Sequence, residues 1–188
     1  MNKLKASLSE KRYNHSLGVR DTAVKLAALF GADEEKAYTA GLYHDCAKGM
    51  SIDEQLEKCC EYGVELTKYD ILCPPVIHAP LGAEIAKREY GICDEEILNA
   101  IRRHTVGGSE MTLLDKIIYT ADMIEPNRDF DGVDKLRLIA QTDINKAYFE
   151  CVKHSLLFNI NSNKAVHPDT LVSYNECIAN KGKGAKTS

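Results

Sequence analysis

The chain has 188 residues, of which 44% are hydrophobic, and this length and composition suit one globular domain with a substantial core. Its 28 acidic and 24 basic residues give a net charge of -4, so no overall basic field favours a nucleic-acid partner, and an anionic ligand must be attracted locally. The N-terminal segment lacks the apolar run of a signal peptide, and no stretch of about 18 apolar residues suggests a membrane span, so we expect no membrane partner and a cytoplasmic protein.

Helical periodicity continues through almost the whole chain, and capping residues predict where the helices begin and end. A long first helix is expected from about Ser9 to Phe30, where Gly31 would terminate it. Asp33 would cap a second helix that contains AYTAGLYHD at residues 37–45. The N-terminal half of the chain is therefore predicted to begin with two consecutive helices.

Ser51 and Glu54 form the sequence pattern of a capping box for a third helix at residues 52–63. Pro80 suits the first turn of the next helix, and later helices are expected at residues 81–91, 95–104, 113–125, 133–140 and 143–159 and after residue 168. Strand-like alternation is nearly absent. The predicted fold class is therefore all-α, with one domain over residues 1–180 and a disordered tail at 181–188, rich in lysine and glycine.

The seven cysteines contain no C-x-x-C pair, which argues against a secreted disulfide framework and against a zinc ribbon. Cys46 directly follows a histidine and an aspartate, and one cysteine beside such a motif is more often a packing residue than a nucleophile. We therefore expect reduced cysteines that mostly fill the core.

Several histidines and aspartates lie on the apolar faces of the predicted helices. A lone histidine on such a face is more often a core residue than a ligand, and an inward carboxylate is destabilising unless it has a partner. Six such residues from five helices would meet inside a helical bundle, where carboxylate and histidine metal sites are built. The six candidates for this metal site are His15, His44, Asp45, His78, His104 and Asp122.

Four basic residues are candidates for contact with an anionic ligand. Lys48 lies one helical turn after His44, and Arg128 lies shortly after Asp122. Each could neutralise phosphate or simply be an exposed charge, and the sequence leaves both alternatives open. Arg20 and Arg103 are further candidates for the same role.

The spacing of these residues resembles the H…HD…D signature of the HD-domain metal-dependent phosphohydrolases. The segments NHSLGVRDTA, AGLYHDCAKGM, VIHAPLGAEIA, IRRHTVG and YTADMIEPNRDFDGV together resemble the bacterial HD-domain family of symmetrical bis(5'-nucleosyl)-tetraphosphatases. These segments cover roughly residues 14 to 140. The resemblance implies an HD-type helical bundle that hydrolyses a phosphoanhydride.

The resemblance also implies how the six candidates share two metal ions. One ion would take His15, His44, Asp45 and Asp122, and the second would take His78 and His104 with Asp45 as a bridge. Nitrogen and carboxylate donors suit iron, manganese, nickel or zinc, and the resemblance favours iron, Fe2+ or Fe3+, over Mn2+, Ni2+ and Zn2+.

The implied reaction is the symmetrical cleavage of diadenosine tetraphosphate into two ADP by a water that the dinuclear centre activates. In this reaction Asp45, Lys48 and Arg128 are the predicted catalytic residues, and Lys48, Arg128, Arg20 and Arg103 are the predicted substrate contacts. The partner would be a dinucleoside polyphosphate or another nucleotide.

Two other functions stay open at this point. HD sites also occur in nucleotidases and in phosphodiesterases that act on other nucleotides, and a module that senses a nucleotide or a metal would bind without turnover. The sequence does not decide the oligomeric state, and a homodimer is among the alternatives.

Overall fold

The computed structural model describes residues 2–184 of the chain, with side chains for residues 3–180. All regular elements in that range are helices, which confirms the predicted all-α fold class. The elements are α1 (Asn2–Ser7), α2 (Glu10–Phe30), α3 (Glu34–Tyr43), α4 (Ile52–Tyr62), α5 (Lys68–Leu72), a 3-10 turn η1 (Pro74–Val76), α6 (His78–Tyr90), α7 (Glu95–Arg103), α8 (Leu113–Ile124), α9 (Val133–Ala140), α10 (Ile144–Asn161) and α11 (Pro168–Gly184).

The predicted helix ends are confirmed where local hydrogen bonds define them. The Ser9 side chain accepts from the backbone N–H of Arg12 at the start of α2, and Gly31 ends that helix in the left-handed conformation at φ 73°. Ser51 and Glu54 form the complete capping box of α4. These ends depend on residues three or four positions apart, so the sequence pattern was sufficient to locate them.

Other boundaries differ from the prediction. α3 ends at Tyr43, so His44 and Asp45 lie in the turn that follows the helix and not within it. The short helices α1 and α5 were not predicted, because five or six residues carry too little periodicity to be recognised. α11 continues to Gly184, while residues 185–188 of the expected tail lie outside the described residues.

The single-domain assignment stays a prediction.

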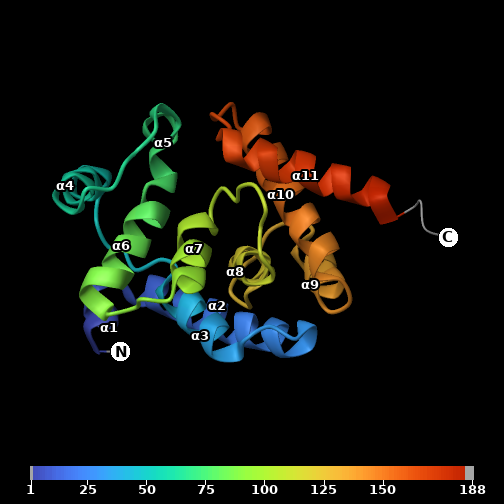
Figure 1. Cartoon of the computed structure of the whole chain (residues 1–188), viewed down its shortest axis with the longest axis horizontal. Coiled ribbons are helices and arrows are strands. Elements are labelled where there is room, and N and C mark those ends of the chain that lie inside the picture. The colour runs from blue at the N-terminus through green and yellow to red at the C-terminus, as the bar shows by residue number, and fades with distance from the viewer. Residues whose placement is uncertain (1, 185–188) are drawn as a thin grey trace.

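The helix α8 is the centre of the arrangement, since it packs against α2, α3, α7, α9 and α10 (Figure 1). α2 and α3 form an antiparallel pair beneath it, and Gly41 permits their close approach, because a Cβ there would lie 2.9 Å from the Cα of Arg20. α10 packs against another side of α8, and α11 packs against α10 (Figure 1). α8 is consequently buried along much of its length.

Two groups of buried apolar side chains hold the helices together. The larger group joins α2, α3, α7, α8 and α10, with Ile117 and Ile118 of α8 fully buried. The smaller group joins α1, α3, α4 and α6 and includes Leu4, Leu42 and Leu81. Burial of each such aliphatic side chain contributes roughly 1.5–3 kcal/mol. The turn after α3 contributes side chains to the smaller group, so His44 and Asp45 are held in a well-packed region.

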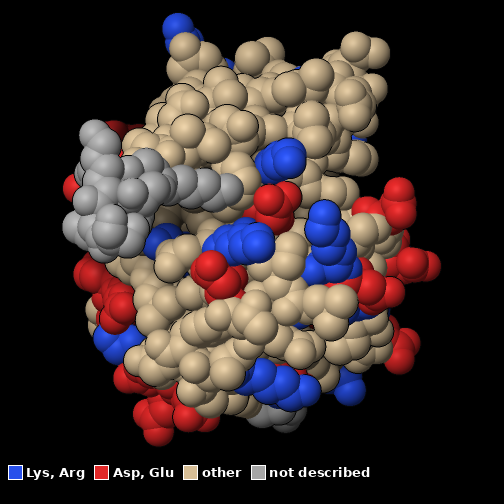
Figure 2. All heavy atoms as spheres, turned by 90° about the vertical axis from the view of Figure 1, so that its right-hand side faces the viewer, with Lys and Arg blue, Asp and Glu red and all other residues tan. Residues whose placement is uncertain are grey.

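Charges of both signs alternate on the face of the molecule that Figure 2 shows, and its upper part is largely uncharged. An anion is therefore not attracted to this face by a continuous basic patch. Within residues 2–184, no helix combines the length and the apolar composition that a membrane span requires.

Candidate metal centre

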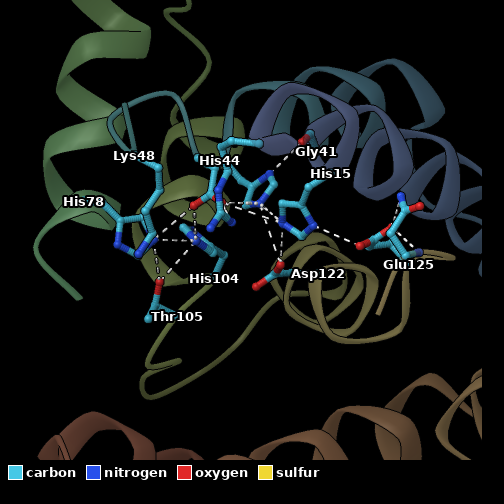
Figure 3. A network of polar contacts seen from close by, with 12 residues as sticks. His15, Gly41, His44, Lys48, His78, His104, Thr105, Asp122 and Glu125 are labelled. Carbon is cyan, nitrogen blue, oxygen red and sulfur yellow. Dashed lines mark hydrogen bonds and ion pairs between the residues drawn. The ribbon is translucent and has the colours of Figure 1, made fainter. Parts of the chain in front are cut away.

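The six residues predicted to bind metal converge on one place inside the bundle, and Figure 3 labels all of them except Asp45. His15 comes from α2, His44 and Asp45 from the turn after α3, His78 from the start of α6, and His104 and Asp122 from the end of α7 and from α8. The four histidines and Asp45 are buried, with exposed fractions of 8% or less, and Asp122 is partly exposed. Five elements far apart in sequence therefore build one buried polar cluster.

One half of the cluster consists of His15, His44 and Asp122. The Nε2 atom of His15 lies 2.9 Å from Oδ1 of Asp122 and 3.3 Å from Nε2 of His44. One ligand atom from each of these three residues can be chosen so that all lie within 4.8 Å of one another. This spacing suits atoms that share a single ion.

The other half consists of His78 and His104. Their Nε2 atoms lie 3.1 Å apart, and the hydroxyl of Thr105 is 3.3 Å and 3.1 Å from them, respectively. His44, Asp45 and His104 form a second group with ligand atoms within 4.8 Å of one another. The two halves are therefore adjacent.

Asp45 lies between the halves and presents a different oxygen to each. Its Oδ2 atom is 3.5 Å from Nε2 of His44 and 3.7 Å from Nε2 of His15. Its Oδ1 atom is 3.2 Å from Nε2 of His78 and 3.6 Å from Nε2 of His104. A carboxylate in this position can serve one ion with each oxygen.

The histidine rings are oriented as metal ligands require. Each Nδ1 faces away from the centre toward an oxygen atom that accepts a hydrogen bond. In a neutral ring Nδ1 therefore carries the proton and Nε2 presents its lone pair to the centre, whereas a protonated ring also donates through Nε2 to the facing carboxylates. Nitrogen lone pairs and two carboxylates turned inward are the donors that bind a transition-metal ion. The residues therefore fit a metal centre.

The charges of the cluster agree with this orientation. Burial alone would raise the pKa of Asp45, but the facing His44 and hydrogen bonds from His104, His44 and His78 hold it well below its usual range. Burial likewise opposes ionisation of Asp122, yet its pKa is lowered by the hydrogen bond from His15 and by Arg128. Burial lowers the pKa of His78 to about 4. Anionic carboxylates and a neutral imidazole are the forms that bind metal.

Two of the four predicted substrate contacts lie at the cluster. Lys48 is half-buried and donates to the carbonyl of Pro75 at 3.3 Å, and burial lowers its pKa. Figure 3 shows it beside His78. Arg128 donates through Nε to the carbonyl of Asp122 at 2.7 Å and through Nη2 to its carboxylate, whose charge raises the pKa of the guanidinium against the effect of burial. Both cations are close enough to reach an anion at the centre.

The structure does not bring the other two predicted contacts to the cluster. Arg20 donates to Asp21 at 2.7 Å and lies over the ring of Tyr38 at 5.2 Å. Arg103 is paired with the buried carboxylate of Asp115 at 3.2 Å. Neither arginine contacts a proposed metal ligand, and their role as substrate contacts stays a prediction.

Sequence reasoning missed three residues that touch the cluster. Arg12 donates to Oδ2 of Asp45 at 2.7 Å, Glu125 accepts from Nδ1 of His15 at 3.0 Å, and Thr105 lies against His78 and His104. The sequence could have indicated Arg12, because this residue precedes His15 by nearly one helical turn and so lies on the same side of α2. No local pattern indicated Glu125, whose partner is 110 residues away.

Cys46 points into the smaller apolar group and donates to the carbonyl of Gly82 at 3.3 Å. Burial raises the pKa of its thiol, so the nucleophilic thiolate is disfavoured. The structure thus supports a packing role for this cysteine.

Two cavities flank the cluster. The first, here named the α10 cavity, has a volume of about 590 Å³ and is lined largely by apolar surface. His104, Asp122, Phe130, His154 and Phe158 are among its lining residues. The second, named the α2 groove, has a volume of about 940 Å³ and is bordered by polar residues at the start of α2 and by the loop after α8. Arg128 and Phe130 line both, so the cavities meet beside the cluster.

Comparison with known proteins relates this chain to a family. Residues 12–127 match the HD domain. The chain is 45% identical to the symmetrical bis(5'-nucleosyl)-tetraphosphatase of Bacillus subtilis and 44% identical to that of Halalkalibacterium halodurans, over 94% and 93% of both chains. A crystal structure of a predicted HD superfamily hydrolase involved in NAD metabolism, from Clostridium acetobutylicum, superimposes with a TM-score of 0.92 at 45% identity and 95% coverage of both chains.

Proposed function

This chain belongs to the HD domain family, and from that premise we propose that its cluster of histidines and aspartates hydrolyses dinucleoside polyphosphates. The chain is a metal-dependent hydrolase of the symmetrical bis(5'-nucleosyl)-tetraphosphatase type, and it cleaves diadenosine tetraphosphate into two ADP. The observation that carries this function is the meeting of six inward-facing histidine and aspartate side chains with two cavities at one point.

The six residues of the cluster are the proposed metal ligands, with two ions per chain and Asp45 as the bridge. The two oxygens of the Asp45 carboxylate lie near different histidines, which supports the bridging role. Bound divalent ions would supply Lewis acidity toward phosphoryl oxygens and a water whose lowered pKa makes it a nucleophile. Iron is the proposed metal, and Mn2+, Ni2+ and Zn2+ fit the same donors.

Phosphate groups are held by the cations around the cluster. Lys48 lies beside His78, Arg128 contacts Asp122, and Arg12 lies against Asp45 at the edge of the α2 groove. Arg128 lines both cavities, so a phosphate in either cavity could contact its guanidinium. These side chains would stabilise the charge that develops on phosphoryl oxygens during cleavage.

One nucleoside of the substrate would occupy the α10 cavity. Phe130 and His154 have ring centroids 4.4 Å apart in this cavity, and Phe158 is 54% exposed along its wall. Flat apolar side chains of this kind stack on nucleobases, and the half-buried amide of Asn159 is placed to recognise a base edge. The other half of the substrate would extend into the α2 groove.

The position of the cluster between the cavities explains the symmetry of cleavage. With a nucleoside on each side, the middle of a four-phosphate chain lies at the cluster, and attack on an inner phosphorus breaks the central anhydride. Both products are then ADP, whereas attack on an outer phosphorus would give AMP and ATP.

Product analysis tests this function. Iron-loaded protein should convert diadenosine tetraphosphate into ADP alone at early times, and labelled water should place one heavy oxygen in one of the two ADP molecules. Stoichiometric AMP and ATP would contradict central cleavage. NAD and mononucleotides should be tested as substrates in the same assay. Rapid hydrolysis of either compound without cleavage of diadenosine tetraphosphate would show that the chain acts on another nucleotide. The homodimer stays a prediction.

A further inference from the structure

The four histidines of the cluster differ in what holds the outer side of each ring. Nδ1 of His44, His78 and His104 donates to the backbone carbonyl three residues earlier, at 2.8, 2.7 and 2.7 Å. Nδ1 of His15 instead donates to the Glu125 carboxylate at 3.0 Å, which comes from the end of α8 (Figure 3). Only the His15 half of the cluster therefore has a charged acceptor behind a ligand ring.

Glu125 is fixed in its position. It is 1% exposed, and while Oε1 accepts from His15, Oε2 accepts from the backbone N–H of Asn127 at 2.8 Å and from its side-chain amide at 3.0 Å. Gly18 of α2 leaves the required space, because a Cβ there would lie 2.5 Å from Oε2. A buried carboxylate is costly without partners, and here both of its oxygens have them.

We propose that Glu125 is a positioning residue that makes the His15 half of the cluster its tighter metal site, so that the two ions bind in order. This inference rests on the metal centre of the proposed function. A carboxylate behind a ligand histidine fixes the ring and its tautomer and raises the basicity of the ligating nitrogen. Hydrogen bonds to a charged acceptor are also stronger than those to a carbonyl.

The other half has a feature that weakens it further. The hydroxyl of Thr105 lies within hydrogen-bond distance of Nε2 of both His78 and His104. The hydroxyl can donate to either nitrogen, so it competes with a metal ion for the lone pairs that would bind it. The His78 and His104 half should accordingly fill second and empty first.

The variant Glu125→Gln tests the proposal with little change of shape. Asn127 presents two N–H donors to Oε2, so the amide should turn its oxygen toward them and its NH2 group toward His15. The proton of His15 would then be forced onto Nε2, the nitrogen that faces the cluster. We expect the tighter of the two binding steps to weaken roughly 10- to 100-fold.

The measurement is a calorimetric titration of chelator-treated protein with Co2+, followed by the absorbance of bound cobalt, and it needs no nucleotide. Wild type should bind in two steps of unequal affinity, and His78→Ala should lose the weaker step alone. Asn127→Ala, which removes one of the two donors to Oε2, should weaken the tighter step in the same direction but less. This second variant keeps the test decisive if Glu125→Gln does not fold, as judged by circular dichroism.

Asp115→Asn is the matched control, because Asp115 is another buried carboxylate of α8 and is paired with Arg103 instead of a histidine. This variant should lower the thermal stability and leave both binding steps unchanged. Equal steps in wild type, or an unchanged first step in both Glu125→Gln and Asn127→Ala, would overturn the inference. Failure of wild type to bind cobalt would instead overturn the metal centre of the proposed function.

Discussion

The part of the chain that matches the HD domain and the helices that follow it contribute differently to the site. All six proposed metal ligands lie within residues 12–127. Helices α9, α10 and α11 contribute none, but α10 supplies His154, Phe158 and Asn159 to the cavity beside the cluster. The proposed nucleoside site in the α10 cavity therefore draws on a helix that contributes no proposed metal ligand, so a substitution in that helix should spare the metal centre.

Asp45→Asn should have the largest effect, because Asp45 faces both halves of the cluster. We expect both metal content and activity to be nearly lost, whereas His78→Ala should deplete mainly one ion. Elemental analysis of protein purified anaerobically without a chelating tag checks this, and wild type should approach two ions per chain. Active wild-type protein without metal would contradict the dinuclear centre.

Lys48→Ala should reduce turnover on the order of a hundredfold or more while metal content stays unchanged, because a donor aimed at developing charge is removed. Arg128→Ala should act in the same direction. Its side chain also contacts the carboxylate of Asp122, so Lys48 gives the cleaner separation of the two roles. Steady-state kinetics beside elemental analysis would test this, and loss of metal from the Lys48 variant would place that residue among the ligands.

Phe158→Ala tests whether α10 takes part in binding the nucleoside. Loss of base stacking should raise the KM for diadenosine tetraphosphate roughly tenfold, with a smaller change in kcat and no change in metal content. Leu157→Ala is the matched control, since this neighbour is also exposed on α10 but does not line the cavity. If both variants behave like wild type, the nucleoside lies elsewhere.

Arg137→Ala should show the smallest effect and tests how the two parts are joined. Arg137 of α9 donates to the carbonyls of Ile124, Glu125 and Arg128 at 3.0, 3.0 and 2.8 Å. Its loss should lower the free energy of unfolding by about 2 kcal/mol, measured by urea denaturation. Asp134→Ala removes only the exposed ion pair of Arg137 and should change stability by less than about 0.5 kcal/mol. If the two variants lower the free energy of unfolding equally, the hydrogen bonds of Arg137 to the carbonyls do not contribute to stability.

Much of the fold was predictable because it depends on short-range interactions. Ser9, Asp33, Ser51, Asp94 and Thr112 each cap a helix through a hydrogen bond to a backbone N–H two or three residues later. The helical spacing also indicated the inward side of the helix for His15 and Asp122, since the side of a helix that a residue occupies follows from its position in the sequence. His44 and Asp45 lie instead in the turn after α3, where helical spacing does not apply.

The remainder was decided by tertiary packing. Whether a basic side chain reaches the cluster depends on how the helices meet, and this brought Arg12 and Arg128 to it while Arg20 and Arg103 found partners elsewhere. Glu125 could not be assigned to His15 from the sequence, because their contact requires the end of α8 to lie beside α2. Local hydrogen bonds are determined by neighbouring residues, whereas a contact across 110 residues exists only after the core has fixed the relative positions of the helices.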